Sequence, residues 1–313
     1  MSPTTVSASP QKSTTVRSFR VPRAVRWAFA AGGWLMPGTT LRRASRLFAT
    51  PLAHSHRRAW EADVSDCRVG QVESGGRTLT TYTWGDPAAQ PWGLFTHGWS
   101  SFGLRCRPWV EPLRQAGYAV VSFDLPGHGR NEPAQTNLVE CAGAGAAVAR
   151  WHGPAAAVLA HSMGGGAAAL AIRDGGLQAG RAVLVAPAAD VLAAGHRFGR
   201  MVGLREPLVE RMFHQFERQL GVPVASLSVH AYLPRFGMPA LVVHDLEDDE
   251  VPWEEGERYA RLWPGARLLS TRGLGHHRIA GDPEVIAAAL RFLRGEPVGE
   301  RVVSSPNLPF GIA

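Results

Sequence analysis

The sequence contains little cysteine, and the three cysteines present are not spaced as partners. Cys67, Cys106 and Cys141 are an odd number of residues, and no CxxC pair occurs among them. This pattern excludes a disulfide framework and a cysteine-ligated zinc site. Because unpaired cysteines are typical of a reducing compartment, we expect the protein to be cytoplasmic.

Lysine is almost absent, since Lys12 is the only one, and the net charge of +7 therefore comes from arginine. The compact Lys/Arg blocks of nucleic-acid-binding segments are missing, so we interpret the arginine content as a compositional bias and expect no nucleic-acid partner. A run of about 18 apolar residues, as a transmembrane helix requires, is also missing. Segment 26–38 follows several arginines as a signal peptide would, but glycines interrupt its short apolar part, so we expect no secretion.

The first 66 residues differ in composition from the rest of the chain. Residues 1–20 are rich in Ser, Thr and Pro and have little to bury, which predicts a disordered tail. In 21–66, apolar residues and arginines recur at helical spacing, which predicts one or two amphipathic helices. We expect these helices to pack on the main domain. The alternative is contact with a membrane surface, with arginine on one helix face and Trp or Phe on the other.

From residue 67 onward, short apolar segments typical of strands alternate with helical segments. This alternation predicts an α/β fold with a mostly parallel sheet and helices on both faces. It extends over 67–190, resumes over 239–296 and ends in a C-terminal tail, 297–313. Between the two parts, 191–238 predicts helices without a strand, and we interpret this insertion as a small helical cap over the carboxyl ends of the strands.

The segment LAHSMGGG, residues 159–166, joins a predicted buried strand to a helix and places Ser162 in the turn between them. Small neighbours permit a sharp turn that lifts the hydroxyl out of the sheet, and the N–H groups of the following helix favour negative charge there. This context predicts a nucleophile elbow, whose usual pattern is G-x-S-x-G. Ala160 replaces the first glycine, whereas Gly164 is in place. The alternative is a purely structural turn.

A serine nucleophile needs a base, and the base needs an acid that orients it. The segment ALVVHDLEDDEVPW offers several acids after a predicted strand, and Asp248 has the best position among them. His276 follows a flexible Gly-Leu-Gly turn after the next strand, and we prefer it as the base to its neighbour His277. Asp190, which follows the segment VLVAPAA, is the alternative acid.

The chain order Ser162, Asp248, His276, with each residue after a strand, resembles that of the α/β-hydrolase superfamily over residues 68–293. Two further segments carry this resemblance. FTHGWS is similar to the His-Gly turn after the third strand of the family, and DLPGHGRN is similar to the Asp-x-x-Gly-x-Gly turn after its fourth strand. The resemblance implies an α/β-hydrolase fold with a cap inserted where the strand alternation breaks.

The resemblance also implies an oxyanion hole formed by the backbone N–H groups of Trp99 and Met163. His97, His128 and Asp124 lie in the predicted turns near this position. We expect these three side chains to fix loop backbone rather than to transfer protons.

The implied activity is that of a serine hydrolase, and we expect a carboxylic ester hydrolase that acts through an acyl-enzyme on Ser162. One alternative is a cofactor-free perhydrolase that uses peroxide on the same triad, although His161 and Ala167 stand where that group commonly has Phe and Glu. Another alternative is a non-catalytic binding protein with this fold. Serine instead of aspartate at the elbow argues against a dehalogenase.

We expect no metal or cofactor, because the histidine pairs lack HExxH spacing and an acidic partner set. The expected partner is a small ester-like molecule, and the candidate substrate-binding residues are Trp99, Met163, Phe198 and Met212. Their apolar side chains suit a hydrophobic acyl or alcohol group. The alternative for the two cap residues is that they form the cap's own core.

Overall fold

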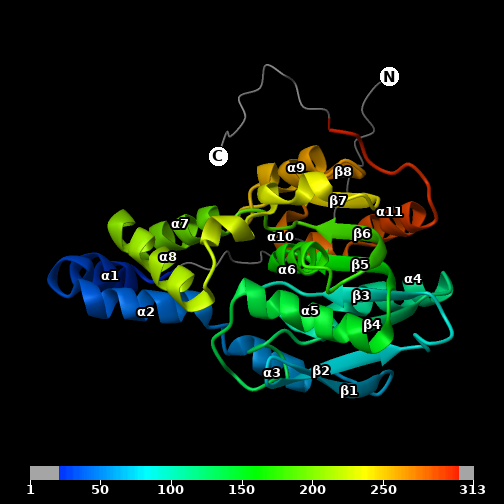
Figure 1. Ribbon diagram of the computed structural model, residues 1–313, viewed down its shortest axis with the longest axis horizontal. Coiled ribbons are helices and arrows are strands. Elements are labelled where there is room, and N and C mark those ends of the chain that lie inside the picture. Colours follow the sequence, from blue (N-terminus) through cyan, green and yellow to red (C-terminus); the bar gives the residue numbers. More distant parts are fainter. Residues whose placement is uncertain (1–20, 303–313) are drawn as a thin grey trace.

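The computed structural model describes residues 21–302, and its centre is an eight-stranded sheet (Figure 1). The strands are β1 (Arg68–Ser74), β2 (Arg77–Trp84), β3 (Trp92–Thr96), β4 (Ala119–Phe123), β5 (Ala155–His161), β6 (Ala179–Val185), β7 (Ala240–Asp245) and β8 (Ala266–Thr271). Their order is β1-β2-β4-β3-β5-β6-β7-β8, and β2 runs antiparallel to both of its neighbours. All pairs from β4 to β8 are parallel. This arrangement confirms the mostly parallel α/β fold.

Helices cover both faces of the sheet, as expected from strands that are apolar along their whole length. One face packs against α5 (Leu138–His152), α6 (Met163–Arg173) and α9 (Trp253–Leu262), and the other packs against α4 (Arg107–Gln115) and α11 (Pro283–Leu293). Successive side chains of a strand point to opposite faces. Leu184 of β6 therefore joins the first core, whereas Val183 joins the second.

Four helices form a lobe that projects from one side of the sheet (Figure 1). α7 (Val191–Val202) and α8 (Glu206–Leu220) lie between β6 and β7, and α1 (Arg23–Leu35) and α2 (Pro37–Ala49) pack against them. Leu41 and Ala44 of α2 share an apolar core with Leu208 of α8. We expected the N-terminal helices to pack on the main domain. α1 and α2 pack on the inserted helices instead, because these present an apolar face of their own. The third N-terminal helix, α3 (His54–Glu61), does pack on the main domain, where Ala59 is buried in the core on one face of the sheet.

The remaining elements connect these layers. They are α3 (His54–Glu61), α10 (Gly275–Arg278) and the 3₁₀ turns η1 (Gly103–Cys106), η2 (Val224–Leu227), η3 (Val229–Ala231), η4 (Leu233–Arg235) and η5 (Ile279–Gly281). Within the described range, no helix has both the length and the apolar composition needed to traverse a bilayer. The disordered tail expected over 1–20, and most of the tail expected over 297–313, lie outside the described residues.

Candidate active site

Ser162 occupies the junction of β5 and α6 in a backbone conformation that is rare for a residue with a side chain. Its φ is 56° and its ψ is −128°, a strained combination that clusters at functional sites. Two residues later, a Cβ atom on Gly164 would lie 2.5 Å from the carbonyl oxygens of Thr96 and His97. Glycine at this position therefore lets the start of α6 lie directly against the loop that follows β3.

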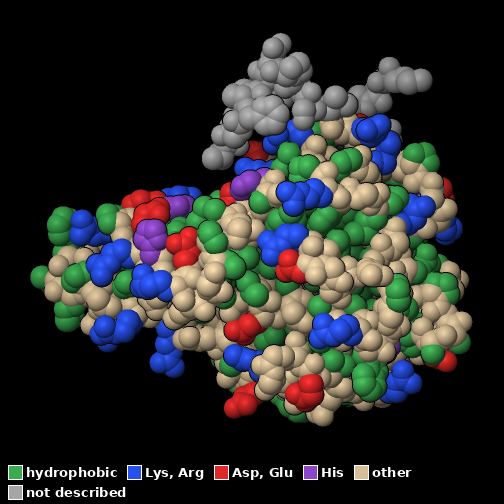
Figure 2. All heavy atoms as spheres, viewed as in Figure 1, with side chains coloured by type: hydrophobic (Ala, Val, Ile, Leu, Met, Phe, Trp, Pro, Cys, Tyr) green, Lys and Arg blue, Asp and Glu red, His purple; other side chains and the backbone are tan. Residues whose placement is uncertain are grey.

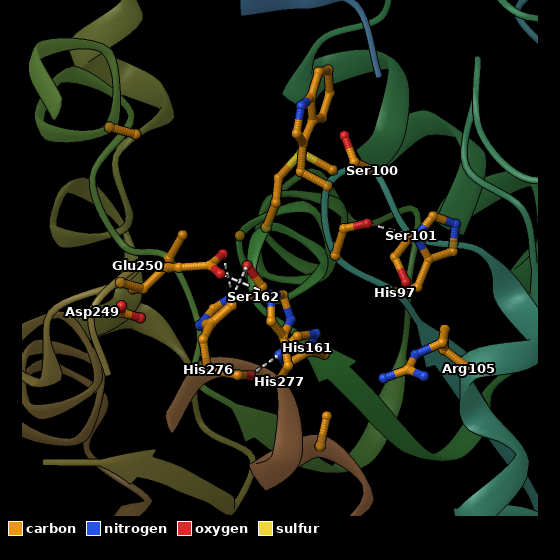
Figure 3. Close-up of a pocket in the computed structure, with 18 of the residues that line it drawn as sticks. His97, Ser100, Ser101, Arg105, His161, Ser162, Asp249, Glu250, His276 and His277 are labelled. Atoms are coloured by element: carbon orange, nitrogen blue, oxygen red, sulfur yellow. Dashed lines mark hydrogen bonds and ion pairs between the residues drawn. The ribbon is translucent and has the colours of Figure 1, made fainter. Parts of the chain in front are cut away.

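A chain of hydrogen bonds connects Ser162 to the two other residues proposed from the sequence. Figure 3 shows how Ser162 and His276 lie in this chain. His276 Nε2 lies 2.9 Å from Ser162 Oγ, and His276 Nδ1 lies 2.7 Å from Asp248 Oδ2. The three side chains come from the ends of β5, β7 and β8, which meet at one edge of the sheet. His277 does not join them, because its Nε2 pairs with Glu250 Oε1 at 2.8 Å.

The carboxylate of Asp248 is fully buried and is held by four hydrogen-bonding contacts. Oδ1 accepts the backbone N–H groups of Glu250 and Val251, both at 2.9 Å, and Oδ2 lies 3.4 Å from His244 Nε2 in addition to its bond with His276. Burial alone would raise the pKa of Asp248, but the hydrogen bonds from His244 and His276 hold it well below the ordinary value. Asp248 is therefore ionised at neutral pH, so His276 carries a proton on Nδ1 and offers Nε2 to the serine.

His244 is a site residue that the sequence analysis missed. It lies fully buried on β7, and its Nε2 is 2.9 Å from the carbonyl oxygen of Val251, so the ring ties the strand to the loop that carries Asp248. Asp245 has a similar role for the loop that carries the base, since its Oδ2 accepts the N–H of Leu274 at 3.0 Å. A histidine inside an otherwise apolar strand is the feature of the sequence that could have indicated the role of His244.

Asp190, the alternative acid, has other partners. Its Oδ1 caps α7 by accepting the N–H of Leu192 at 2.9 Å, and its Oδ2 lies 3.2 Å from an Arg258 guanidinium nitrogen. These contacts hold the start of α7 to α9. The acid that contacts His276 is therefore Asp248.

The backbone of the loop after β3 lies directly beside Ser162. A Cβ atom on Gly98 would lie 2.9 Å from the Cβ atom of Ser162. Within residues 21–302, the backbone N–H groups of Trp99 and Met163 donate to no protein acceptor. Both groups are therefore free to bind a ligand oxygen.

Two buried polar residues hold this loop, as expected from the sequence. His97 Nδ1 lies 2.7 Å from the carbonyl oxygen of Gly98, and its Nε2 accepts the N–H of Leu125 at 3.0 Å. Burial lowers the pKa of His97 well below its ordinary value, so the ring is neutral. Asp124 accepts the N–H of Gly103 at 2.6 Å and fixes the neighbouring turn.

His161, the residue before Ser162, packs against His276. The ring centroids of His161 and His276 are 4.9 Å apart, and His161 Nε2 lies 2.9 Å from the His276 carbonyl oxygen. Burial, helped by the neighbouring charge of His276, lowers the pKa of His161 to about 3. The neutral ring therefore donates from Nε2 and orients the backbone that carries the base.

A cleft of about 2730 Å³ extends from Ser162 toward the lobe. Of the four candidate substrate-binding residues, Trp99, Met163 and Phe198 line this cleft. Met212 does not, and that expectation was wrong. It is 0% exposed, because it lies on the inner face of α8 in the core shared by the lobe helices.

One group of side chains in the described part of the chain could approach a metal ion. It consists of His196, Glu206 and Glu210 on α7 and α8. His196 Nδ1 lies 2.6 Å from Glu206 Oε1, and both glutamates are more than half exposed. The two glutamates are surface residues, and the group lies outside the hydrogen-bonded chain at Ser162.

Comparison with known proteins identifies the family. The sequence model of the alpha/beta hydrolase family matches residues 94–289, which is more than half of the chain. The chain therefore belongs to the alpha/beta hydrolase family, and the protein is a hydrolase by class. A curated relative, the dihydrolipoyllysine-residue acetyltransferase component of the acetoin cleaving system of Cupriavidus necator, is 35% identical over 167 residues. That match covers 49% of this chain but only 40% of the relative's length.

Solved structures agree on the fold. The esterase RhEst1 from Rhodococcus sp. ECU1013 has a TM-score of 0.55 and 20% identity, and the match covers 73% of this chain and 98% of that one. The thioesterase domain from the curacin biosynthetic pathway has a TM-score of 0.53 and 18% identity, with 73% and 99% covered. At these identities the similarity extends to the fold alone.

The close contact at Gly164 generates a first prediction. Gly164→Ala should lower the free energy of unfolding by about 1–3 kcal/mol, because the added methyl group meets two carbonyl oxygens that belong to fixed backbone. Urea denaturation measures the change. Gly143→Ala is the matched control, since Gly143 is also helical but a Cβ atom added to it would meet no atom within 4 Å. That variant should gain roughly 0.5–1 kcal/mol. Equal effects of the two substitutions would contradict the conclusion that the contact at Gly164 leaves no room for a side chain.

His161 generates a prediction about acid stability. Its folded-state pKa of about 3 lies below the ordinary 6.5, so the unfolded chain binds more protons between these values. The free energy of unfolding should therefore fall as the pH decreases from about 7 to about 4. His161→Phe should reduce this fall, as measured by urea denaturation at both pH values. His54→Phe, at an exposed position, is the control and should keep the wild-type dependence. An unchanged acid loss in His161→Phe would refute the prediction.

Proposed function

We propose that the protein is a serine hydrolase that cleaves carboxylic esters through an acyl-enzyme on Ser162. The observation that carries this proposal is the hydrogen-bonded chain from Ser162 Oγ through His276 to Asp248, with distances of 2.9 and 2.7 Å. In this order, the buried carboxylate orients the neutral imidazole, and the imidazole can take the proton of the hydroxyl. The serine oxygen thereby becomes a nucleophile.

In the first half of the reaction, Ser162 Oγ attacks the ester carbonyl carbon while His276 Nε2 takes the hydroxyl proton. Asp248 stabilises the resulting imidazolium through the Nδ1–H bond. The carbonyl oxygen becomes an oxyanion, and the N–H groups of Trp99 and Met163 would donate to it because they have no other acceptor among residues 21–302. One such donor is typically worth about 3–4 kcal/mol of transition-state stabilisation.

Collapse of this intermediate breaks the ester C–O bond, and His276 gives its proton to the departing alcohol. The acyl group is then bonded to Ser162. Water attacks the acyl carbon and gives a proton to His276, the bond to Ser162 Oγ breaks, and the serine regains the proton as the carboxylic acid leaves. His276 Nε2 therefore accepts and then releases a proton in each half-reaction.

The cleft supports an apolar acyl ester as the substrate. Trp99, Met163 and Phe198 present apolar surface along it, and apolar walls with a few polar groups are typical of small-molecule sites. Two proteins with this fold are named an esterase and a thioesterase. Both names describe cleavage of an acyl group from oxygen or sulfur, the chemistry that we infer for this chain.

The proposal predicts that Ser162 is the residue acylated. Ser162→Ala should lower kcat/KM for p-nitrophenyl esters by at least about 10³-fold, because the nucleophile is removed. The same substitution should abolish covalent labelling by a fluorophosphonate, read by intact-protein mass. Ser101→Ala is the matched control, since Ser101 lines the same cleft outside the hydrogen-bonded chain and should still be labelled.

Other outcomes would reject the proposal. Absence of labelling in the wild-type protein would favour a non-catalytic binding protein with this fold. Peroxide-dependent bromination without ester cleavage would favour the perhydrolase chemistry on the same three residues.

A second carboxylate lies close to the base. Glu250 Oε2 is 4.0 Å from His276 Nε2, and the side chain is directed at His276 and His277 (Figure 3). Burial alone would raise the pKa of Glu250, but the hydrogen bond from His277 holds it below the ordinary value. That same hydrogen bond raises the pKa of His277. An ionised Glu250 would stabilise the imidazolium that forms during each half-reaction.

Replacing this charge tests its contribution. Glu250→Gln should reduce kcat/KM by roughly 3- to 10-fold, since opposite charges at a partly exposed site retain about 1 kcal/mol after screening. Asp249→Asn is the control, because in the described part of the chain Asp249 forms no ion pair with a histidine. That neighbour should keep wild-type kinetics with p-nitrophenyl esters. A smaller effect of Glu250→Gln than of Asp249→Asn would contradict the proposed role.

A further inference from the structure

We propose that the hairpin formed by α1 and α2, residues 23–49, binds the surface of an anionic lipid bilayer. The outer face of α1 carries the first observation. An apolar stripe runs along it at the spacing i, i+3, i+4, i+7 and i+11, and consists of Ala24, Trp27, Ala28, Ala31 and Leu35. Trp27 is 74% exposed and Leu35 is 79% exposed. A surface helix of a globular protein normally turns such a stripe inward.

The inner face of α1 is already occupied, so the exposed stripe is a second apolar surface on the same helix. Phe29 packs on the lobe core, and Gly33 is buried against Leu208. Trp34 is also exposed, and the Arg205 guanidinium stacks on its ring. Contiguous exposed apolar surface of this kind marks an interaction site.

The outer face of α2 is basic. Arg42, Arg43 and Arg46 are exposed, while Leu41 and Ala44 point inward. Among the described residues, none of these three arginines forms an ion pair. Their charges are therefore available to an anionic partner.

The excess of basic over acidic residues lies in the first 60 residues, and five of the arginines there belong to the hairpin: Arg23, Arg26, Arg42, Arg43 and Arg46. The first 60 residues contain ten Lys or Arg and no Asp or Glu, whereas the other 253 contain 23 basic and 26 acidic residues. The net charge of +7 is thus not a uniform compositional bias. Figure 2 shows basic side chains across the lobe, both over α1 and α2 and beside the acidic side chains and histidine over α7 and α8.

An anionic bilayer matches both surfaces of the hairpin. Tryptophan and leucine insert at the headgroup boundary, and arginines beside them contact lipid phosphates. A second copy of the chain fits less well, because a symmetric contact through this face would bring one cluster of arginines toward another. The proposal therefore commits to the bilayer and leaves self-association as a test outcome.

The hairpin also borders the active-site cleft. Val25 and Arg26 of α1 and Leu47 and Phe48 of α2 line the cleft that contains Ser162. Docking the hairpin would bring this border of the cleft next to lipid. We therefore infer amphiphilic acyl esters held in the membrane as the substrate class, a step that rests on the proposed function.

Vesicle binding tests the surface directly. The full chain would be floated with vesicles of phosphatidylcholine alone or of phosphatidylcholine and phosphatidylglycerol in equal amounts, at low and high salt. We expect strong binding to the anionic vesicles, weak binding to the neutral ones, and a loss of binding at high salt. Absence of binding to both kinds of vesicle would overturn the proposal, as would a dimer in sedimentation that is broken by hairpin substitutions.

Matched variants separate the two surfaces. Trp27→Gln with Leu35→Gln, and separately Arg42→Gln with Arg43→Gln and Arg46→Gln, should each lower the partition coefficient by roughly 10- to 100-fold. The apolar control is Trp151→Gln with Val139→Gln, which replaces two exposed residues of α5. The basic control is Arg150→Gln with Arg235→Gln and Arg301→Gln. Equal losses in hairpin and control variants would contradict a specific surface.

Catalysis is measured apart from binding. Ser162→Ala should bind vesicles as the wild-type protein does, so a failed labelling experiment and a failed flotation experiment lead to different conclusions. With Ser162 intact, the hairpin variants should keep full activity on a soluble p-nitrophenyl ester. They should lose activity on a p-nitrophenyl ester of a long acyl chain presented in anionic vesicles. Equal activity of the hairpin variants on both substrates would reject the inferred substrate class.

Discussion

The geometry of the candidate active site depends on one close contact, between the first turn of α6 and the loop that follows β3. Gly164 and Gly98 leave no side chain between these segments, so backbone lies against backbone and against the elbow serine. The positive φ of Ser162 is sustained by this contact, because relaxing it would move α6 away from the sheet. Within residues 21–302 the N–H groups of Trp99 and Met163, one on each side of this contact, have no acceptor, and we propose that they bind the oxygen of the attacked carbonyl.

The proposed base, His276, and the proposed acid, Asp248, are positioned in a different way, by a set of buried polar contacts among loops. Asp245 holds the loop that carries His276, and His244 holds the loop that carries Asp248. His161 adds a contact to the backbone of the base from the elbow side. Each loop end is therefore fixed by a residue on a strand, which lets flexible connections present side chains with little freedom.

Strand alternation and the order of motifs were sufficient to predict the sheet and the three side chains at its edge. Each of those residues follows a strand, and parallel strands end at a common edge, so the sequence determines their proximity. The contacts of His244, His161 and Glu250 were not predictable in this way, because they join loops whose paths depend on tertiary packing. Met212 was misassigned for a related reason: helical spacing gives a residue's face but not which neighbour covers that face.

The N-terminal helices show where local pattern and tertiary structure diverge. The sequence of α1 is apolar on two sides, which by itself fits a helix buried all round. Only one side is covered, because α7 and α8 offer a single complementary face. The arginines of α2 disfavour contact with another copy of the same surface, yet the exposed Trp27 and Leu35 disfavour leaving it in water. An interface with anionic groups above an apolar interior satisfies both requirements, and the cleft reaches the edge of that surface. Exposed apolar side chains are unfavourable in water, and clustered arginines are unfavourable against an identical copy. A surface that carries both is favourable at an anionic bilayer.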